Sequence, residues 1–336
     1  MSTPATERAP GCVRAPAAAE FRPQLTYAVT PPSQTTTPER RSAIAAAQSA
    51  RVSSLPVDAL LVYDVQDEAA RNESPRPFRF VPKFDPLSYA FDDLQVGGLQ
   101  RIVYRAVAEQ GEPSLCHWLD KLQAHGGHAV LVGAPSRRTA ASLTLPQAFA
   151  LCRRYTPGLV FGGVVIPERH QTSGAEDARV WAKLQQGCGF FVSQTVWSVS
   201  ATKHLLLALR TRAELEGGQP PPILLTFSPC GSQQTLEFME WLGVAVPETV
   251  KRDLLSAEDM LARSIELATE TFAEISAFAA EQGLSVGCNV ESVSSRAMEV
   301  EASVELVRRI HQLDPRPRIT RENPFAVLRA SRAAMT

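Results

Sequence analysis

The sequence predicts a single-domain α/β protein, a (β/α)8 TIM barrel. Eight short apolar runs alternate with helical segments along one chain of 336 residues. The run from Val57 to Tyr63 is apolar almost throughout, as strands buried on both faces of a parallel sheet are. Polar residues follow the runs, at the strand ends where such barrels place their functional groups.

Each element is predicted from apolar periodicity and from the residues that begin or end it. The expected strands are 25–30, 57–63, 99–104, 128–132, 161–166, 190–192, 223–227 and 284–290. The expected helices outside 167–187 are 38–52, 87–94, 113–125, 145–155, 200–216, 233–242, 256–282 and 296–312. Pro38 opens the first helix, and Ser256 with Asp259 forms a capping box for the longest one, which Gly283 ends.

The segment between the fifth and sixth strands is predicted to be a polar loop, Pro167–His170, followed by a helix. That helix places Ala178, Trp181 and Leu184 on one face, with Gly187 at its C-terminal cap. The main alternative fold is an open, doubly wound sheet. No G-x-G-x-x-G sequence opens a helix, which disfavours a nucleotide-binding fold of that kind.

Composition limits the partners and the location. The formal net charge is −1 and no basic run is present, which argues against nucleic acid. No apolar run approaches the ~20 residues of a membrane helix. The first residues lack an apolar signal core, so we expect a cytoplasmic protein. We interpret residues 1–24 as a flexible tail, 25–312 as the catalytic barrel and 313–336 as a C-terminal tail; a homo-oligomer stays possible.

The six cysteines stand singly and form no C-x-x-C pair, so we expect reduced thiols and no metal or redox site. Cys230 is interpreted as an inert buried thiol rather than a nucleophile.

Candidate site residues are the polar side chains at the ends of the predicted strands. They are Tyr63, Asp64, Asp67, Arg105, Glu168, Arg169, His170, Gln194, Ser228, Asn289 and Glu291. Glu291 ends a strand poor in charge, where burial would raise its pKa and suit it to donate a proton. Asp64 is the second candidate for this acid. The alternatives are solvated loop acids at Asp64 and Asp67, and a structural cap at Gln194.

Residues 168–170 are expected to serve the site, with a local salt-bridge cluster as the alternative.

Several motifs, in the same order along the chain, resemble the methylenetetrahydrofolate reductase family over residues 25–312. The segment Pro167–His170 is similar to the family's Y-P-E-x-H element, and Lys183–Cys188 with Gln194 is similar to K-x-D-A-G-A and the strand that ends in T-Q. Weaker matches are Tyr27–Pro32, Thr226–Pro229 and the V-P-E segment at Pro247.

The resemblance implies a TIM barrel that reduces 5,10-methylenetetrahydrofolate to 5-methyltetrahydrofolate, in the one-carbon metabolism that serves methionine biosynthesis. Ring opening needs an acid, and the resulting iminium carbon needs a hydride donor stacked on it. Gln194 matches a glutamine that contacts the folate in relatives. Glu168 and His170 match motif positions, and we place Ser228 and Asn289 in the same substrate site.

Departures from the family pattern concern the flavin and the acid. Ala28 stands where the family has a catalytic glutamate, and Gly133–Pro135 replaces its R-G-D element. Of the flavin contacts, only Lys183 clearly matches. We therefore expect direct hydride transfer from NADH or NADPH, as in a flavin-independent branch of the family, with FAD the less favoured cofactor. Lys183, Arg105 and Tyr63 are the expected cofactor contacts.

Two other functions stay open at this point. The first is a catalytically inactive or partner-dependent barrel that binds folate, which Ala28 and Pro135 suggest. The second is an unrelated barrel enzyme, such as a lyase or aldolase, that uses Lys183 or Lys203 as an amine.

Overall fold

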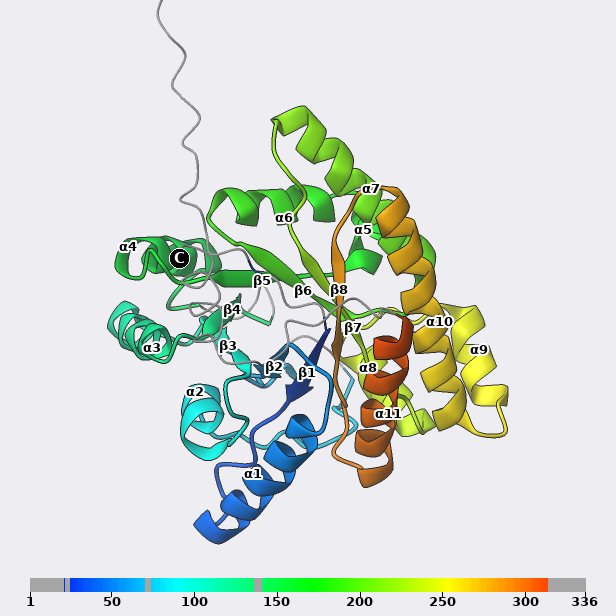
Figure 1. The fold of residues 1–336 in the computed structure, drawn as a ribbon, viewed down its shortest axis with the longest axis horizontal. Helices are drawn as coiled ribbons and strands as arrows, with labels where there is room; N and C mark the ends of the chain where they lie inside the picture. Colours follow the sequence, from blue (N-terminus) through cyan, green and yellow to red (C-terminus); the bar gives the residue numbers. More distant parts are fainter. Residues whose placement is uncertain (1–20, 22–24, 70–73, 136–140, 314–336) are drawn as a thin grey trace, which may run out of the picture.

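The computed structural model describes residues 21, 25–69, 74–135 and 141–313, so the predicted tails lie outside it except for Phe21 and Leu313. The strands form a closed barrel in which each pairs in parallel with its neighbours in chain order and β8 pairs with β1. Helices surround this barrel (Figure 1). The predicted fold class, a single-domain (β/α)8 barrel, is confirmed.

The strands are β1 (Leu25–Val29), β2 (Ala59–Val62), β3 (Gln100–Ala106), β4 (His128–Val132), β5 (Phe161–Val165), β6 (Phe190–Thr195), β7 (Ile223–Phe227) and β8 (Val286–Val290). The helices are α1 (Pro38–Ser53), α2 (Pro86–Ser88), the π-helical η2 (Tyr89–Asp93), α3 (Glu112–Ala124), α4 (Leu145–Tyr155), α5 (Pro167–Ser173), α6 (Glu176–Gln185), α7 (Val199–Glu216), α8 (Gln233–Trp241), α9 (Glu248–Ser256), α10 (Met260–Glu281) and α11 (Ala297–Leu313). In the part of the chain that the structure describes, no helix combines the length and apolar character needed to cross a bilayer.

Side chains alternate between the inside of the barrel and the layer beneath the helices, because strand residues point to opposite faces in turn. The inner layer is small and mostly aliphatic, and includes Ala28, Leu61, Ile102, Val130, Phe190, Val192 and Leu224. At the N-terminal end of β6, the ring of Phe21 stacks on Phe190 with centroids 3.7 Å apart. Gly162 is needed beside Phe190, because an added Cβ would lie 2.7 Å from the Phe190 carbonyl oxygen.

The polar segment after β5 is a short helix rather than the predicted loop. Pro167 occupies the first turn of α5, where its missing N–H costs nothing, and the helix ends at Gly174 with a positive φ of 60°. Glu168 and His170 are therefore helical residues, displaced from the strand end by the first turn of α5.

The long helix predicted at 256–282 is wrong in its first part. Ser256 is the last residue of α9, a helix that the sequence did not predict, and the extended Ala257 separates α9 from α10, which begins at Met260. Ser256 ends α9, and Asp259 is itself the N-cap of α10, accepting a hydrogen bond from the Ala262 N–H at 2.9 Å. The two residues therefore do not form one capping box.

Candidate active site

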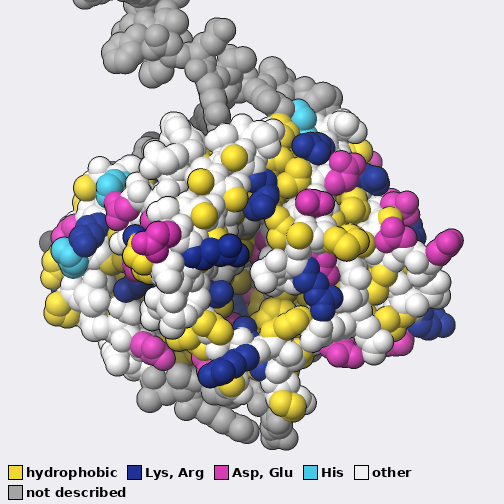
Figure 2. Space-filling view, turned by 90° about the horizontal axis from the view of Figure 1, so that it is seen from below, with side chains coloured by type: hydrophobic (Ala, Val, Ile, Leu, Met, Phe, Trp, Pro, Cys, Tyr) yellow, Lys and Arg dark blue, Asp and Glu magenta, His cyan; other side chains and the backbone are white. Residues whose placement is uncertain are grey.

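The C-terminal ends of the strands form one face of the molecule. In Figure 1, α10 leads upward into β8, and β8 runs down toward the start of α11, so the C-terminal end of β8 lies on the lower side. Figure 2 views the molecule from below and shows a hollow near the middle of this side, with Lys and Arg side chains around it. We refer to this opening as the mouth.

Glu291 follows the last residue of β8 and is held by groups from three other strands. Its backbone N–H donates to the Phe227 carbonyl at 3.0 Å. Its Oε1 accepts a hydrogen bond from Thr195 Oγ1 at 3.1 Å, and its carboxyl also meets the hydroxyl of Tyr63. Burial raises the pKa of Glu291, and the hydrogen bonds from Tyr63 and Thr195 offset part of this increase. The direction agrees with the expectation from sequence.

A polar layer lies beneath Glu291 inside the barrel. The Asn289 amide nitrogen donates to the Tyr63 hydroxyl at 3.0 Å and to Thr226 Oγ1 at 3.2 Å, and Asn289 Oδ1 accepts from Thr26 Oγ1 at 2.9 Å. The ring of Tyr63 packs edge to face against the ring of Tyr104, with the ring centroids 4.6 Å apart. This layer fixes the Tyr63 hydroxyl against the carboxyl of Glu291.

Both tyrosines are neutral hydrogen-bonding groups. Burial first, and the nearby Glu291 second, raise the pKa of Tyr63 and of Tyr104 well above the ordinary phenol value. The mouth therefore holds an acid and two aromatic rings in one place, a combination that can protonate a ligand and stack against it.

A β-bulge in β6 turns Thr195 toward Glu291. Val192 pairs with Leu224, and Thr195 pairs with Thr226. Between these two pairs, β6 therefore contains one residue more than β7. Ser193 Oγ accepts a hydrogen bond from the Thr226 N–H at 2.8 Å. If side chains simply alternated along β6, Thr195 would point away from the barrel interior. Thr195 is therefore not among the candidate residues that the sequence predicts.

Gln194, near the end of β6, and Ser228, just after β7, are bonded to the loops that follow the strands. The Gln194 amide nitrogen donates to the Leu242 carbonyl at 3.1 Å, just after α8. Ser228 Oγ accepts from the Val293 N–H at 3.2 Å. Gln194 therefore makes the structural contact that the sequence left as an alternative.

The predicted cluster at 168–170 divides between two places. Glu168 is buried, and its carboxylate accepts hydrogen bonds from the backbone N–H groups of Trp197 (3.3 Å) and Ser198 in the loop after β6. Arg169 pairs with Glu176 at 3.3 Å, and His170 Nδ1 lies 3.5 Å from Asp177. The salt-bridge alternative therefore describes Arg169, and both Arg169 and His170 belong to the α5–α6 region.

Burial raises the pKa of Glu168 from 4.5 to about 7, which makes a prediction for stability. Unfolded chains lose this proton near the ordinary value and folded chains near the higher one, so stability falls as pH rises between the two. The shift corresponds to at most about 3 kcal/mol. We expect Glu168→Gln to match the wild type in urea unfolding near pH 5 and to exceed it near pH 8. Parallel pH profiles for the two proteins would contradict this.

Asp64, Asp67, Arg105 and Lys183 lie outside the group at the mouth. Asp64 accepts a hydrogen bond from the Ala106 N–H at 2.8 Å and so ties β2 to β3. Arg105 donates to Asp85 at 3.2 Å and to Gln110 at 2.8 Å. Lys183, which lies on α6, donates a hydrogen bond to the Val164 carbonyl at 2.6 Å. Asp67 is exposed in the loop after β2. Of the expected cofactor contacts, only Tyr63 reaches the mouth.

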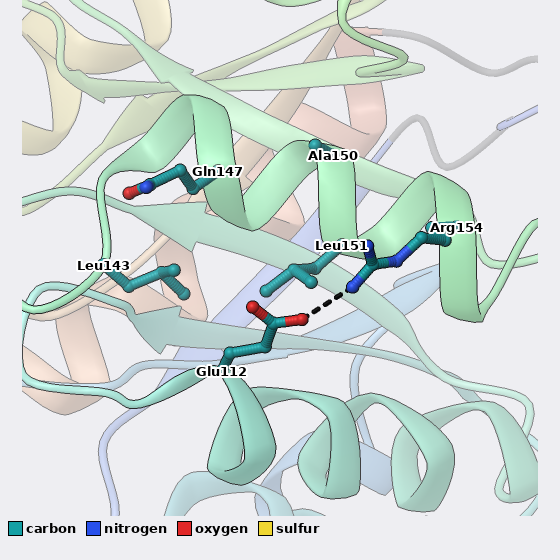
Figure 3. Close-up of a pocket in the computed structure, with 6 residues that line it drawn as sticks. All are labelled: Glu112, Leu143, Gln147, Ala150, Leu151 and Arg154. Carbon is teal, nitrogen blue, oxygen red and sulfur yellow. Dashed lines mark hydrogen bonds and ion pairs between the residues drawn. The ribbon is translucent and has the colours of Figure 1, made fainter.

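Two other features of the surface and core carry no chemistry at the mouth. The depression in Figure 3 lies between α3 and α4, where Glu112 and Arg154 form an exposed ion pair at 2.6 Å beside Leu143 and Leu151. Cys230 is buried, and this burial raises its pKa to about 12, which fits the inert thiol that the sequence predicted.

Comparisons with known proteins find similar solved structures, and one of them has substantial identity to this chain. It is an uncharacterised protein from Clostridium thermocellum, described as binding two copies of 5-methyl-5,6,7,8-tetrahydrofolic acid. The identity is 33%, the match covers 88% of this chain and 97% of that chain, and the TM-score is 0.76.

More remote structures are a 2,3-dimethylmalate lyase (10% identity, 91% and 88% covered, TM-score 0.40) and an oxaloacetate acetylhydrolase in complex with oxalate (14%, 77% and 92%, TM-score 0.37). No protein-family model and no curated protein matches the chain.

Proposed function

We propose that this chain, which belongs to the same family as the Clostridium thermocellum protein, binds a reduced folate at the mouth of its barrel and reduces 5,10-methylenetetrahydrofolate with NADH or NADPH. Folate binding is the broader part of the proposal, supported by a relative that binds 5-methyltetrahydrofolate. That ligand is the product of the proposed reaction, so a site that accepts it also suits the closely similar substrate.

The observation that carries the reductase part is the position of Glu291. Its carboxyl group stands at the mouth with a raised pKa, beside Tyr63 and Thr195. Opening the five-membered ring of the substrate requires a proton on N10, and a carboxyl group whose acid form is favoured by burial can supply it. Asn289 and Tyr63 would keep that carboxyl in place while Gln194 and Ser228 border the substrate.

NADH or NADPH would supply the hydride for the methylene carbon. Tyr63 and Tyr104 offer aromatic surface at the mouth. Lys183 and Arg105 already bond to other groups and do not face it, so we assign neither of them to the nucleotide.

The test has two measurements on the purified protein. Isothermal titration with 5-methyltetrahydrofolate should give saturable binding, and NADH or NADPH should be consumed when 5,10-methylenetetrahydrofolate is added without flavin. Absence of binding would overturn the whole proposal. Binding without consumption of either nucleotide would overturn the reductase part alone.

A second candidate is a folate-binding protein without redox activity. It is favoured by Ala28, which lies inside the barrel where the resemblance places a catalytic glutamate. The titration and the nucleotide assay together separate this candidate from the reductase.

A further inference from the structure

Residues 74–84, in the connection between β2 and α2, border the mouth; we call them the rim segment. At one end, Trp241 Nε1 of α8 donates to the Ser74 carbonyl at 3.0 Å. At the other end, the Gln34 N–H donates to the Pro82 carbonyl at 2.9 Å. Helix α8 follows β7, and Gln34 follows β1. Because β8 lies between β7 and β1, the rim segment passes the end of β8, on the side of the mouth that holds Glu291.

Arg76 of the rim segment is enclosed by aromatic rings. Its guanidinium carbon lies 5.2 Å from the centroid of Phe80, 5.3 Å from Phe238 and 5.2 Å from Trp241. These rings hold the cation by its faces and leave its edges for hydrogen bonding. Among the residues that the structure describes, buried Nε and Nη1 of Arg76 have no hydrogen-bond partner. The ion pair of Nη1 with Asp67 is 3.9 Å long, beyond hydrogen-bonding distance.

Lys83 places a second positive charge in the same segment. Burial, and then the charge of Arg76, lower the pKa of this half-buried lysine, so the two cations repel each other. Burial lowers the pKa of Arg76, and the negative charges of Asp67 and Glu68, which precede it in the chain, offset part of this decrease. Two neighbouring cations are stabilised by an anion that lies near both, and a carboxylate fits the planar guanidinium edge.

We propose that Arg76 and Lys83 form an anion site at the rim that binds the glutamate carboxylates of a folate. This inference rests on the proposed function, because it concerns the same ligand. A folate carries its carboxylates at the end opposite the pterin. With the pterin and N10 directed to Glu291, the glutamate end extends outward, past the end of β8, to the rim segment.

The experiment compares 5-methyltetrahydrofolate with 5-methyltetrahydropteroate, which lacks the glutamate. We expect the wild type to bind the folate on the order of fivefold to tenfold more tightly, in line with partly exposed ion pairs. Lys83→Gln should bring this ratio close to one without weakening the pteroate, and Lys83→Arg should largely preserve it. Lys121→Gln, an exposed lysine of α3, is the matched control and should leave the ratio unchanged.

Arg76→Gln provides a second variant, but its loss could loosen the aromatic packing, so Lys83→Gln is decisive. An unchanged ratio in Lys83→Gln would overturn the inference while pteroate binding still supported the proposed function. A loss of NADPH affinity with an unchanged ratio would assign the anion site to nucleotide phosphates and overturn the glutamate assignment. Failure of the wild type to bind either pterin compound would instead overturn the proposed function, and the inference with it.

Discussion

Glu291→Gln is expected to lower kcat/KM for methylenetetrahydrofolate reduction by roughly 10²–10⁴, the range that positioned proton transfer contributes. The amide keeps the shape of the side chain and an oxygen that can accept the hydrogen bond from Thr195, but it has no acidic proton. The dissociation constant for 5-methyltetrahydrofolate should therefore stay within about threefold of the wild type. Steady-state NAD(P)H oxidation and titration calorimetry measure the two quantities.

The pH profile gives an independent check on the same residue. Because burial raises the pKa of Glu291, its acid form persists to higher pH than that of an ordinary carboxyl group. Wild-type kcat/KM should fall as pH rises through this elevated value, and the residual rate of Glu291→Gln should not. Asp64→Asn is the comparison, since the Asp64 carboxylate bonds to the Ala106 N–H of β3. A full rate in Glu291→Gln with a loss in Asp64→Asn would transfer the acid role to Asp64.

Glu299→Ala is expected to cost about 3 kcal/mol or more of unfolding free energy, because it removes a buried acceptor shared by several donors. Glu299, on α11, is only 2% exposed. Its carboxylate accepts hydrogen bonds from the Gly231 N–H at 2.8 Å, from Thr235 Oγ1 at 2.8 Å and from Ser294 Oγ. It thus joins the loops after β7 and β8, and its loss leaves those donors without a partner.

Urea unfolding at neutral pH measures this cost, with Glu301→Ala as the control. Glu301 lies on the same helix and is exposed, so its removal should change stability by less than about 0.5 kcal/mol. Equal stabilities for the two variants would show that the loops do not depend on Glu299.

The barrel could be predicted from the sequence because its strands are local, continuous apolar runs. The predicted and observed bounds of His128–Val132 and Ile223–Phe227 agree to the residue. Helix ends depended on capping residues, and there the sequence was ambiguous. The spacing of Ser256 and Asp259 satisfies a capping box, yet Asp259 alone caps α10, because the chain is extended at Ala257.

The site was predictable only where strand ends and side-chain direction coincide. The structure brings Glu291, Asn289 and Tyr63 together because each lies at or next to the end of a strand and points inward; their roles stay a prediction. Arg105 is the residue before the end of β3, but its side chain points outward, whereas the preceding Tyr104 points inward. Arg76 and Lys83 could not be placed, because the course of the rim segment depends on contacts with α8 that are distant in sequence.

The hydroxyl of Ser193 is a hydrogen-bond acceptor that the neighbouring strand, β7, would otherwise lack. By accepting from the Thr226 N–H, it lets β6 accommodate its extra residue without leaving that amide unsatisfied. The direction of Thr195, and with it one of the two side-chain hydrogen bonds to the Glu291 carboxyl, therefore depends on the buried side chain of Ser193. Removing one residue from β6 would turn the side chains at its end to the opposite face of the sheet. Relatives of this chain should therefore be aligned here by hydrogen-bond register rather than by counting residues.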